Sequence, residues 1–211
     1  MRLARLRKSP AALAAAALVA NALLVELFLA WHWRTCRWPD EPGPPRSRVV
    51  VVADPQLTDR SSYDFAKSGP ILWLVSFLCD AYLTRAFAMV RALRPDAVVF
   101  LGDLMDGGRH FADNEFEAEL SRLNRITQLP AALQTMHVAG NHDMGLGLSF
   151  CTGCAARFEK RISPLNHMSS IGNVTFIAVD TVSTASMPDA PQAAQHRRFS
   201  RQAHAFLGEV S

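Results

Sequence analysis

Four short apolar runs, each followed by polar residues, limit the possible folds of this chain more than any other feature of its sequence. They cover residues 49–53, 97–101, 136–139 and 174–179. Apolar runs of this length that are rich in β-branched residues are typical of buried strands. Longer helical stretches separate the first three. The sequence therefore predicts β-α-β-α-β followed by a further strand, which is a largely parallel, layered α/β sheet with flanking helices.

Two helices are predicted between these strands. The first covers residues 71–93, because Gly69 and Pro70 are start signals and a proline follows its end. The second covers residues 115–126, with Asn114 and Glu117 as a capping box. Each helix is long enough to cross over from one parallel strand to the next.

A longer apolar segment, residues 11–31, precedes these elements and matches the ~20 helical residues that cross a bilayer core. Four basic residues lie directly before it: Arg2, Arg5, Arg7 and Lys8. The positive-inside bias then favours a cytosolic N-terminus and a lumenal remainder. A cleaved signal peptide is the alternative, because residues 14–20 offer small-residue cleavage sites. The apolar run continues beyond the usual length of such a peptide, which favours the anchor.

The chain is thus expected to have four parts. They are a basic cytosolic N-terminus (1–10), a transmembrane signal anchor (11–31), a Pro-rich linker (32–47) and one α/β domain (48–211). The linker reads as stiff, because proline cannot continue a helix. The net charge is only +3 and the basic residues form no long face, so nucleic acid is not an expected partner.

Potential metal ligands follow each of the first three strands. They are Asp54 after the first strand, Asp103 and Asp106 after the second, and Asn141, His142 and Asp143 after the third. In open parallel sheets, sites form beyond the carboxyl ends of the strands, where these side chains converge. A single Asp after a strand is more often a turn former or a helix cap. The appearance of such residues at three successive strand ends is what favours a metal site.

The chemistry that suits these residues is hydrolysis of a phosphate ester. Water attacks the anionic ester poorly until positive charge offsets the repulsion, and two divalent metals ~3.5 to 4 Å apart can supply that charge. Asp103 is predicted to bridge them, because it leaves the central strand and Gly102 lets the backbone approach closely. Asp54 is expected to bind one metal, and the amide oxygen of Asn141 the other.

The remaining residues at the strand ends have supporting roles in this prediction. His142 is expected to stabilise charge in the transition state or to protonate the leaving oxygen. Asp106 and Asp143 are expected to orient the ligands through hydrogen bonds. Arg109 and His110 are candidates for contacting the substrate phosphate, and Arg109 is the better one because a guanidinium grips phosphate through two bonds.

Three blocks carry a resemblance to a known family. Residues 53–59 (ADPQLTD), 102–108 (GDLMDGG) and 139–145 (AGNHDMG) look like successive signature blocks of the calcineurin-like metallophosphoesterase superfamily. With the N-terminal anchor, they resemble its membrane-bound branch in the endoplasmic reticulum and Golgi, which removes ethanolamine phosphate from GPI-anchor glycans. The resemblance covers roughly residues 48–179.

The resemblance implies a metal-dependent phosphodiester hydrolase with two divalent ions, Mn²⁺ first and Zn²⁺ or Fe as alternatives. The implied substrate is the GPI-anchor glycan or another phosphodiester. The implied location is the endoplasmic reticulum or Golgi membrane, with a single span and a lumenal domain.

Two departures from the family pattern matter. Gln56 stands where most of the superfamily has His, and an amide oxygen is a weaker ligand for a transition metal. The pattern also continues with a further His and a Gly-His-x-His block, which this sequence lacks before Ser211. His196 and His204 lie instead in or beside a predicted closing helix, 198–210. The sequence is therefore interpreted as an incomplete domain that lacks its C-terminal half. The competing hypothesis is an inactive, membrane-anchored remnant or interaction protein.

The cysteines and the other histidines have simpler interpretations. Cys151 and Cys154 have the spacing of a local disulfide, a redox motif or half of a zinc site. No second pair has metal-ligand spacing, which favours a disulfide or two free thiols. His137 is expected to pack within a strand, and His167 to lie in a loop. A Rossmann-type nucleotide site is disfavoured, because no Gly-rich turn follows the first strand.

Overall fold

The computed structural model describes residues 10–40, 42–44, 46–185 and 193–210. The chain forms two compact units, Met1–Glu41 and Pro42–Ser211, and each is described by itself. The four basic residues expected on the cytosolic side of a membrane lie outside the described residues, as do two residues of the Pro-rich segment.

The first unit is one long apolar helix, α1 (Pro10–Thr35), which contains the whole predicted anchor. Its 26 residues correspond to roughly 39 Å of helix, which exceeds the thickness of a bilayer core. The mean hydropathy reaches 2.2 within Pro10–His32, and none of this stretch is buried in protein. An exposed apolar helix of this length is compatible with a single membrane span.

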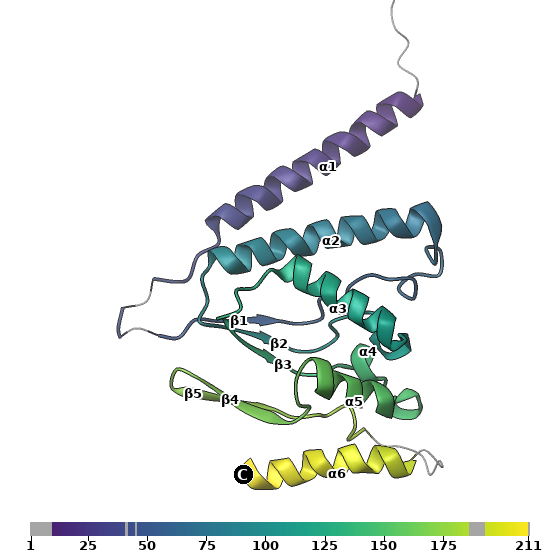
Figure 1. The fold of residues 1–211 in the computed structure, drawn as a ribbon. Coiled ribbons are helices and arrows are strands. Elements are labelled where there is room, and N and C mark those ends of the chain that lie inside the picture. The colour runs from purple at the N-terminus through teal and green to yellow at the C-terminus, as the bar shows by residue number, and fades with distance from the viewer. Residues whose placement is uncertain (1–9, 41, 45, 186–192, 211) are drawn as a thin grey trace, which may run out of the picture. The chain divides into compact units, whose positions relative to one another are not determined.

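The second unit is built on a parallel sheet, as Figure 1 shows. Its strands are β1 (Val49–Val52), β2 (Ala97–Phe100) and β3 (Gln134–His137), in the order β1-β2-β3. Val49 pairs with Ala97, and Ala97 pairs with Gln134. All four residues of β2 are buried, as expected for a central strand covered on both faces. The predicted α/β class with flanking helices is confirmed.

Two helices cover one face of this sheet. They are α2 (Gly69–Ala92) and α3 (Asp113–Thr127), which connect β1 to β2 and β2 to β3. Val98 and Phe100 point to this side and pack in one core with Phe87 and Val90 of α2. The alternate residues of β2 point to the opposite face, as the period of a strand requires. The main core therefore lies between the helices and the sheet.

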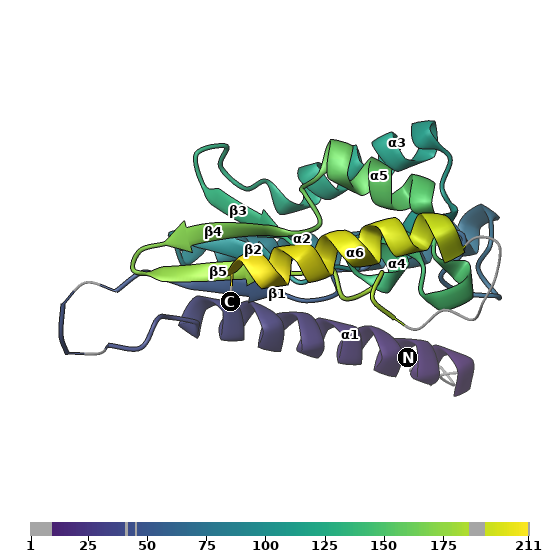
Figure 2. The ribbon, with the colours of Figure 1, turned by 90° about the horizontal axis from the view of Figure 1, so that it is seen from below.

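A two-stranded antiparallel hairpin packs against the other face. It consists of β4 (His167–Ile171) and β5 (Val174–Ala178), and Ile171 and Ala178 form a second core with β2 and β3 (Figure 2). The strand predicted at residues 174–179 is present as β5, and it pairs with β4 instead of joining the parallel sheet. The predicted loop position of His167 was wrong, because His167 begins β4. Gly172, with a φ of +59°, allows the tight turn that folds the two strands back on each other.

Short elements follow the strand ends. They are a 3₁₀ turn η1 (Gly108–His110), α4 (Asn141–Met144), a 3₁₀ turn η2 (Gly147–Ser149), α5 (Thr152–Arg161) and α6 (Ala193–Val210). Phe199 of α6 is buried and packs edge-on against Phe150, with 5.8 Å between ring centroids. The predicted closing helix is therefore present and begins earlier than expected.

Two local predictions need correction. The N-cap of α3 is Ala112, and no side chain caps it, so Asn114 and Glu117 do not form the predicted capping box. The third strand begins at Gln134 and ends at His137, before the predicted 136–139 run is complete. Gln134 lies on an edge strand, where a polar side chain can find a partner. Its Nε2 donates to Ser169 Oγ at 2.8 Å.

His137 packs in the strand, as the sequence predicts. Its ring stacks on Phe100 with 4.7 Å between centroids. Burial lowers the pKa of His137 from 6.5 to about 4, and the nearby His167 adds a smaller effect in the same direction. The folded chain therefore binds fewer protons at this site than the unfolded chain does between pH 6.5 and about 4.

We expect His137→Phe to make the fold less sensitive to acid. In the wild type, neutral His137 contributes its full stabilisation above pH 6.5. This contribution, about 3 kcal/mol, is lost as the pH falls to about 4. Denaturant unfolding of both proteins in detergent, at the two ends of this window, measures the difference. Other titrating groups are shared by both proteins and cancel. Equal pH dependence in the two proteins would contradict the prediction.

Candidate metal centre at the strand ends

The loops that follow β1 and β2 are joined by backbone hydrogen bonds. Gln56 N donates to Asp103 O at 3.0 Å, and Leu57 N donates to Leu104 O at 3.2 Å. Leu57 also forms an isolated parallel bridge with Met105. These contacts hold the Asp54–Gln56 turn beside Asp103, as the sequence predicts from the two strand ends.

Three residues in these loops have left-handed backbones. Asp54, Gln56 and Asp103 have φ values of +49°, +36° and +50°. Non-glycine residues seldom adopt this conformation, and such strain collects at functional sites, where surrounding contacts maintain it. It occurs at two predicted metal ligands, Asp54 and Asp103, and at Gln56, a weaker candidate, which supports a site here.

The third strand end approaches the second through two glycines. A Cβ on Gly102, whose φ is +94°, would lie 2.6 Å from Gly140 N. A Cβ on Gly140 would overlap Asp103 Oδ1 and lie 2.6 Å from Asp103 N. Only glycine allows this approach, so both glycines are required to bring the residues after β3 against Asp103.

The buried Asp143 carboxylate connects the loop after β2 to the segment after β3 through hydrogen bonds. Its carboxylate accepts hydrogen bonds from Asp103 N at 2.8 Å, Leu104 N at 3.1 Å and Gly140 N at 2.9 Å. Burial raises the pKa of Asp143 from 3.8 to about 7, and the charge of Asp103 adds to this effect, while the three backbone donors oppose it. Asp143 therefore lies where it orients the candidate ligand Asp103 by way of the backbone.

Asp103 is buried between these loops. Its Oδ1 accepts a hydrogen bond from His142 N at 2.7 Å. Its Oδ2 accepts no hydrogen bond within the described part of the chain. Asn141, the residue before His142, is exposed at the start of α4. The structure thus brings Asp103 and the Asn141–His142 pair together and leaves one carboxylate oxygen of Asp103 for another partner.

The ring of His142 is oriented by Asp106. Nδ1 lies 2.8 Å from Asp106 Oδ1 and 2.7 Å from the backbone oxygen of Asp106. Both of these atoms are acceptors, so Nδ1 carries a proton and Nε2 is the nitrogen left for chemistry. Asp106 therefore has the orienting position that the sequence suggested, although its direct partner is His142.

Asp59 is a buried residue to which the sequence analysis assigned no role. Its carboxylate accepts from Ser61 N and Ser61 Oγ at 2.6 Å each, and from Gly107 N at 2.7 Å. The Asp-x-Ser spacing is a turn signal that could have indicated the first two contacts. The third connects the loop after β1 to the loop after β2, so Asp59 helps to position both.

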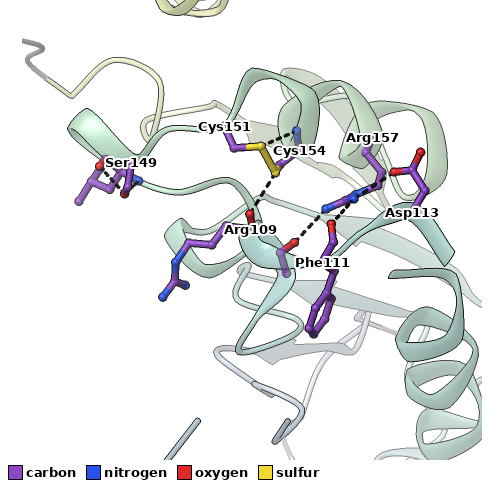
Figure 3. Close-up of a disulfide and its surroundings, with 9 residues drawn as sticks. Arg109, Phe111, Asp113, Ser149, Cys151, Cys154 and Arg157 are labelled. Carbon is purple, nitrogen blue, oxygen red and sulfur yellow. Dashed lines mark hydrogen bonds and ion pairs between the residues drawn. A yellow bond between two sulfur atoms is a disulfide. The ribbon is translucent and has the colours of Figure 1, made fainter. Parts of the chain in front are cut away.

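Arg109 and His110 lie in the 3₁₀ turn η1, close to the same loops. Arg109 Nη1 donates to Asp106 O at 3.2 Å, and His110 is exposed. Figure 3 shows the Arg109 guanidinium directed away from the nearby disulfide. That disulfide joins Cys151 to Cys154, in agreement with one of the two interpretations that the sequence favoured, a disulfide or two free thiols.

Arg157 of α5 contacts the backbone of η1 and of the residue that follows it (Figure 3). Its Nη1 donates to Phe111 O at 2.8 Å, and its Nη2 donates to Gly108 O at 2.9 Å. Its guanidinium also lies over the Phe116 ring, 4.5 Å from the centroid. Arg157 therefore fixes the backbone on either side of Arg109 and His110.

We expect Arg157→Ala to lower the free energy of unfolding by about 2 to 4 kcal/mol, because it leaves two carbonyls without their charged donor and removes the packing on Phe116. Arg161→Ala on the same helix is the matched control. Arg161 is half-exposed and pairs with Glu117 at the surface, which predicts a loss within about 1 kcal/mol. Denaturant unfolding of both variants measures the difference, and equal losses would contradict this role of Arg157.

The oxygen ligands gathered here are of the kind that binds a divalent cation, because carboxylate and amide oxygens are hard ligands. The open Oδ2 of Asp103 and the exposed carboxylate of Asp54 are available for such an ion. Among the described residues, however, no group of three or more His, Cys, Asp or Glu side chains is placed to hold a metal. The described residues therefore fit one part of a metal site.

Comparison with known proteins agrees with this geometry. Residues 47–187 match the family model described as "Calcineurin-like phosphoesterase". The chain is 32% identical over 171 residues to "Cell division control protein 1" of Saccharomyces cerevisiae, covering 80% of this chain and 34% of the yeast protein. It is 29% identical over 159 residues to "Metallophosphoesterase 1 homolog" of Drosophila melanogaster, covering 70% of this chain and 39% of the fly protein.

A mammalian relative also matches most of this chain. "Metallophosphoesterase 1" of Ailuropoda melanoleuca is 28% identical over 185 residues, covering 83% of this chain and 45% of that protein. The chain thus spans less than half the length of each of these three curated relatives. The family match covers most of the chain and includes every residue of the candidate site. The chain therefore belongs to the calcineurin-like phosphoesterase family.

Proposed function

We propose that this chain carries residues of a metal-dependent site that hydrolyses a phosphodiester. The observation that carries the proposal is the meeting of three strand ends around Asp103, through the Gln56–Asp103 and His142–Asp103 hydrogen bonds. Family membership supports a hydrolase of phosphoric esters. The substrate, the mechanism and the residue roles below are part of the proposal.

Calcineurin-like phosphoesterases use divalent metal ions. We assign two ions to this site, with Mn²⁺ as the first candidate. Asp103 would bridge them, Asp54 would bind one and Asn141 the other, and Gln56 is a weaker candidate for the first. Bound divalent ions would offset the negative charge of the ester and lower the pKa of the attacking water.

The residues around the ligands would position the substrate and move protons. His142 would present Nε2 to the ester, because Asp106 occupies Nδ1. A protonated Nε2 would donate to the phosphoryl or leaving oxygen as negative charge develops there. Arg109, held in η1 by the contacts of Arg157, would contact a phosphate oxygen, and the exposed His110 would lie beside it.

We further propose that the chain acts on membranes of the endoplasmic reticulum or Golgi, on ethanolamine phosphate of GPI-anchor glycans. The resemblance of the signature blocks to that branch supports the substrate, and relatives named Metallophosphoesterase 1 support a metallophosphoesterase activity. The exposed apolar helix α1 supports membrane attachment. The Cys151–Cys154 disulfide is consistent with an oxidising lumen.

Hydrolysis of a chromogenic phosphodiester by the chain in detergent tests the proposal. We expect activity that requires Mn²⁺, disappears with a chelator and returns when Mn²⁺ is added back. A product that forms at the same rate in chelator would contradict a metal-dependent reaction.

The second candidate is an inactive, membrane-anchored interaction protein. The absence of a three-residue metal-binding group in the described part of the chain favours it. It predicts weak Mn²⁺ binding that Asp103→Asn leaves unchanged, whereas the phosphodiesterase proposal predicts binding that this substitution removes.

A further inference from the structure

The helix α2 carries an exposed apolar face that nothing in the second unit covers among the described residues. Its members lie between residues 71 and 82, toward the N-terminal end of the helix, and are Ile71, Trp73, Leu74, Phe77, Leu78 and Tyr82. Between 49% and 66% of each residue is exposed. Trp73 and Phe77 stack on each other, with 5.5 Å between ring centroids. Contiguous apolar surface of this kind marks an interaction site.

The opposite face of α2 is already used by the fold. Phe87 and Val90 are buried in the main core, and Arg91 Nη1 donates to Thr127 O at the end of α3. Both ends of α2 are also fixed, because it connects two neighbouring strands of one sheet. The helix is long and apolar enough to span a membrane, but it cannot cross a bilayer while it remains part of this core.

A helix with one face in a protein core and an apolar outer face can lie in the plane of a membrane interface. The outer face of α2 suits that position, because Trp73 and Tyr82 are residue types enriched at the headgroup level. The loop before α2 adds two further exposed aromatic residues, Tyr63 and Phe65, whose ring centroids are 5.3 Å apart.

The anchor α1 proposed above would keep the second unit at a membrane. The segment between Thr35 and Val49 spans at most roughly 45 Å when fully extended. That tether keeps the domain close to the bilayer at all times, so docking of α2 costs far less entropy than binding from solution.

We propose that the outer apolar face of α2 docks on the lipid bilayer into which α1 is inserted. The apolar half of α2 lies at the same end of the sheet as the candidate metal centre (Figure 1). Ser76 Oγ donates to Thr58 O at 3.4 Å, within the loop that follows Asp54 and Gln56. Docking would therefore hold the candidate metal centre near the headgroups, where a phosphodiester attached to a lipid is found. This inference rests on the proposed membrane attachment.

Tryptophan fluorescence tests the docking without any measurement of activity. The chain has four tryptophans, so Trp31→Phe, Trp33→Phe and Trp38→Phe together leave Trp73 as the only one. This full-length variant is placed in phosphatidylcholine nanodiscs whose acyl chains are either plain or brominated. We expect Trp73 to lose most of its emission in the brominated discs and to resist quenching by iodide in solution.

Two further variants of the single-tryptophan chain make the test specific. Leu78→Glu places a charge within the apolar face and should restore Trp73 emission in brominated discs. Ala88→Glu places the same charge on an exposed position of the C-terminal half of α2 and should leave the quenching in place. Equal effects of the two substitutions would overturn the proposal.

The remaining outcomes are distinct. A chain that does not co-purify with nanodiscs overturns the anchor and the docking together. A chain that co-purifies, but whose Trp73 is quenched by iodide and not by bromine, overturns the docking alone. Protection of Trp73 from both quenchers means that protein covers the face, either α1 or a second copy, and also overturns docking on lipid.

Discussion

Replacing Asp103 by Asn is expected to reduce Mn²⁺-dependent phosphodiester hydrolysis by about two to three orders of magnitude, while the fold remains intact. The substitution removes the negative charge assigned to the bridge between two cations. It keeps a carbonyl oxygen that can still accept the hydrogen bond that His142 N now donates to Oδ1. The effect should therefore fall on metal binding and catalysis rather than on folding.

Asp64→Asn is the matched control for this substitution. Asp64 is a fully exposed carboxylate that pairs with Lys67 at the surface, outside the candidate site. Initial rates are measured for wild type and both variants over a range of Mn²⁺ concentrations. Activity that survives Asp103→Asn at the level of Asp64→Asn would exclude Asp103 as a metal ligand.

Gly140→Ala is expected to destabilise the domain by about 3 kcal/mol or more. Its backbone is extended, with φ of −106° and ψ of −177°, so alanine meets no conformational penalty. The cost is steric, because the added methyl group would overlap Asp103 Oδ1 and approach Asp103 N. Relief requires the loops after β2 and β3 to separate, which breaks the hydrogen bonds that Asp103 N and Leu104 N donate to the buried Asp143 carboxylate.

The control is Gly208→Ala in α6. No atom lies within 4 Å of a Cβ at Gly208, and alanine is favoured over glycine within a helix, so a stabilisation of up to about 1 kcal/mol is expected. Denaturant unfolding in detergent compares the two variants with wild type. A stability for Gly140→Ala equal to that of wild type would show that the two loops are not packed as described.

The strand ends could be predicted from the sequence because β-branched runs and the residues that follow them are local signals. Asp54, Asp103 and Asn141 were placed at the ends of three neighbouring parallel strands in this way, and the structure has them there. The strand at residues 174–179 was predicted, but its antiparallel pairing with β4 was not, because an apolar run does not reveal its partner. Gly172 was the signal that could have indicated the turn.

Contacts between the loops could not be predicted, because they depend on how the strands are aligned. The hydrogen bond between Asp59 and Gly107 joins residues far apart in the sequence, and the Asp106–His142 contact does the same. Neither spacing has a local signature. The start of α3 at Asp113 was missed for a different reason, since no side chain caps the helix at Ala112 and a search for capping residues favours Asn114.

The central claim is that Asp103 anchors a divalent-metal site at the three strand ends. Titration of the full chain with Mn²⁺, followed by the loss of the free-ion electron paramagnetic resonance signal, tests it most directly and requires no substrate. We expect binding by the wild type and by Asp64→Asn, and little or none by Asp103→Asn. Equal binding by all three proteins would contradict the claim and favour an inactive membrane-anchored protein.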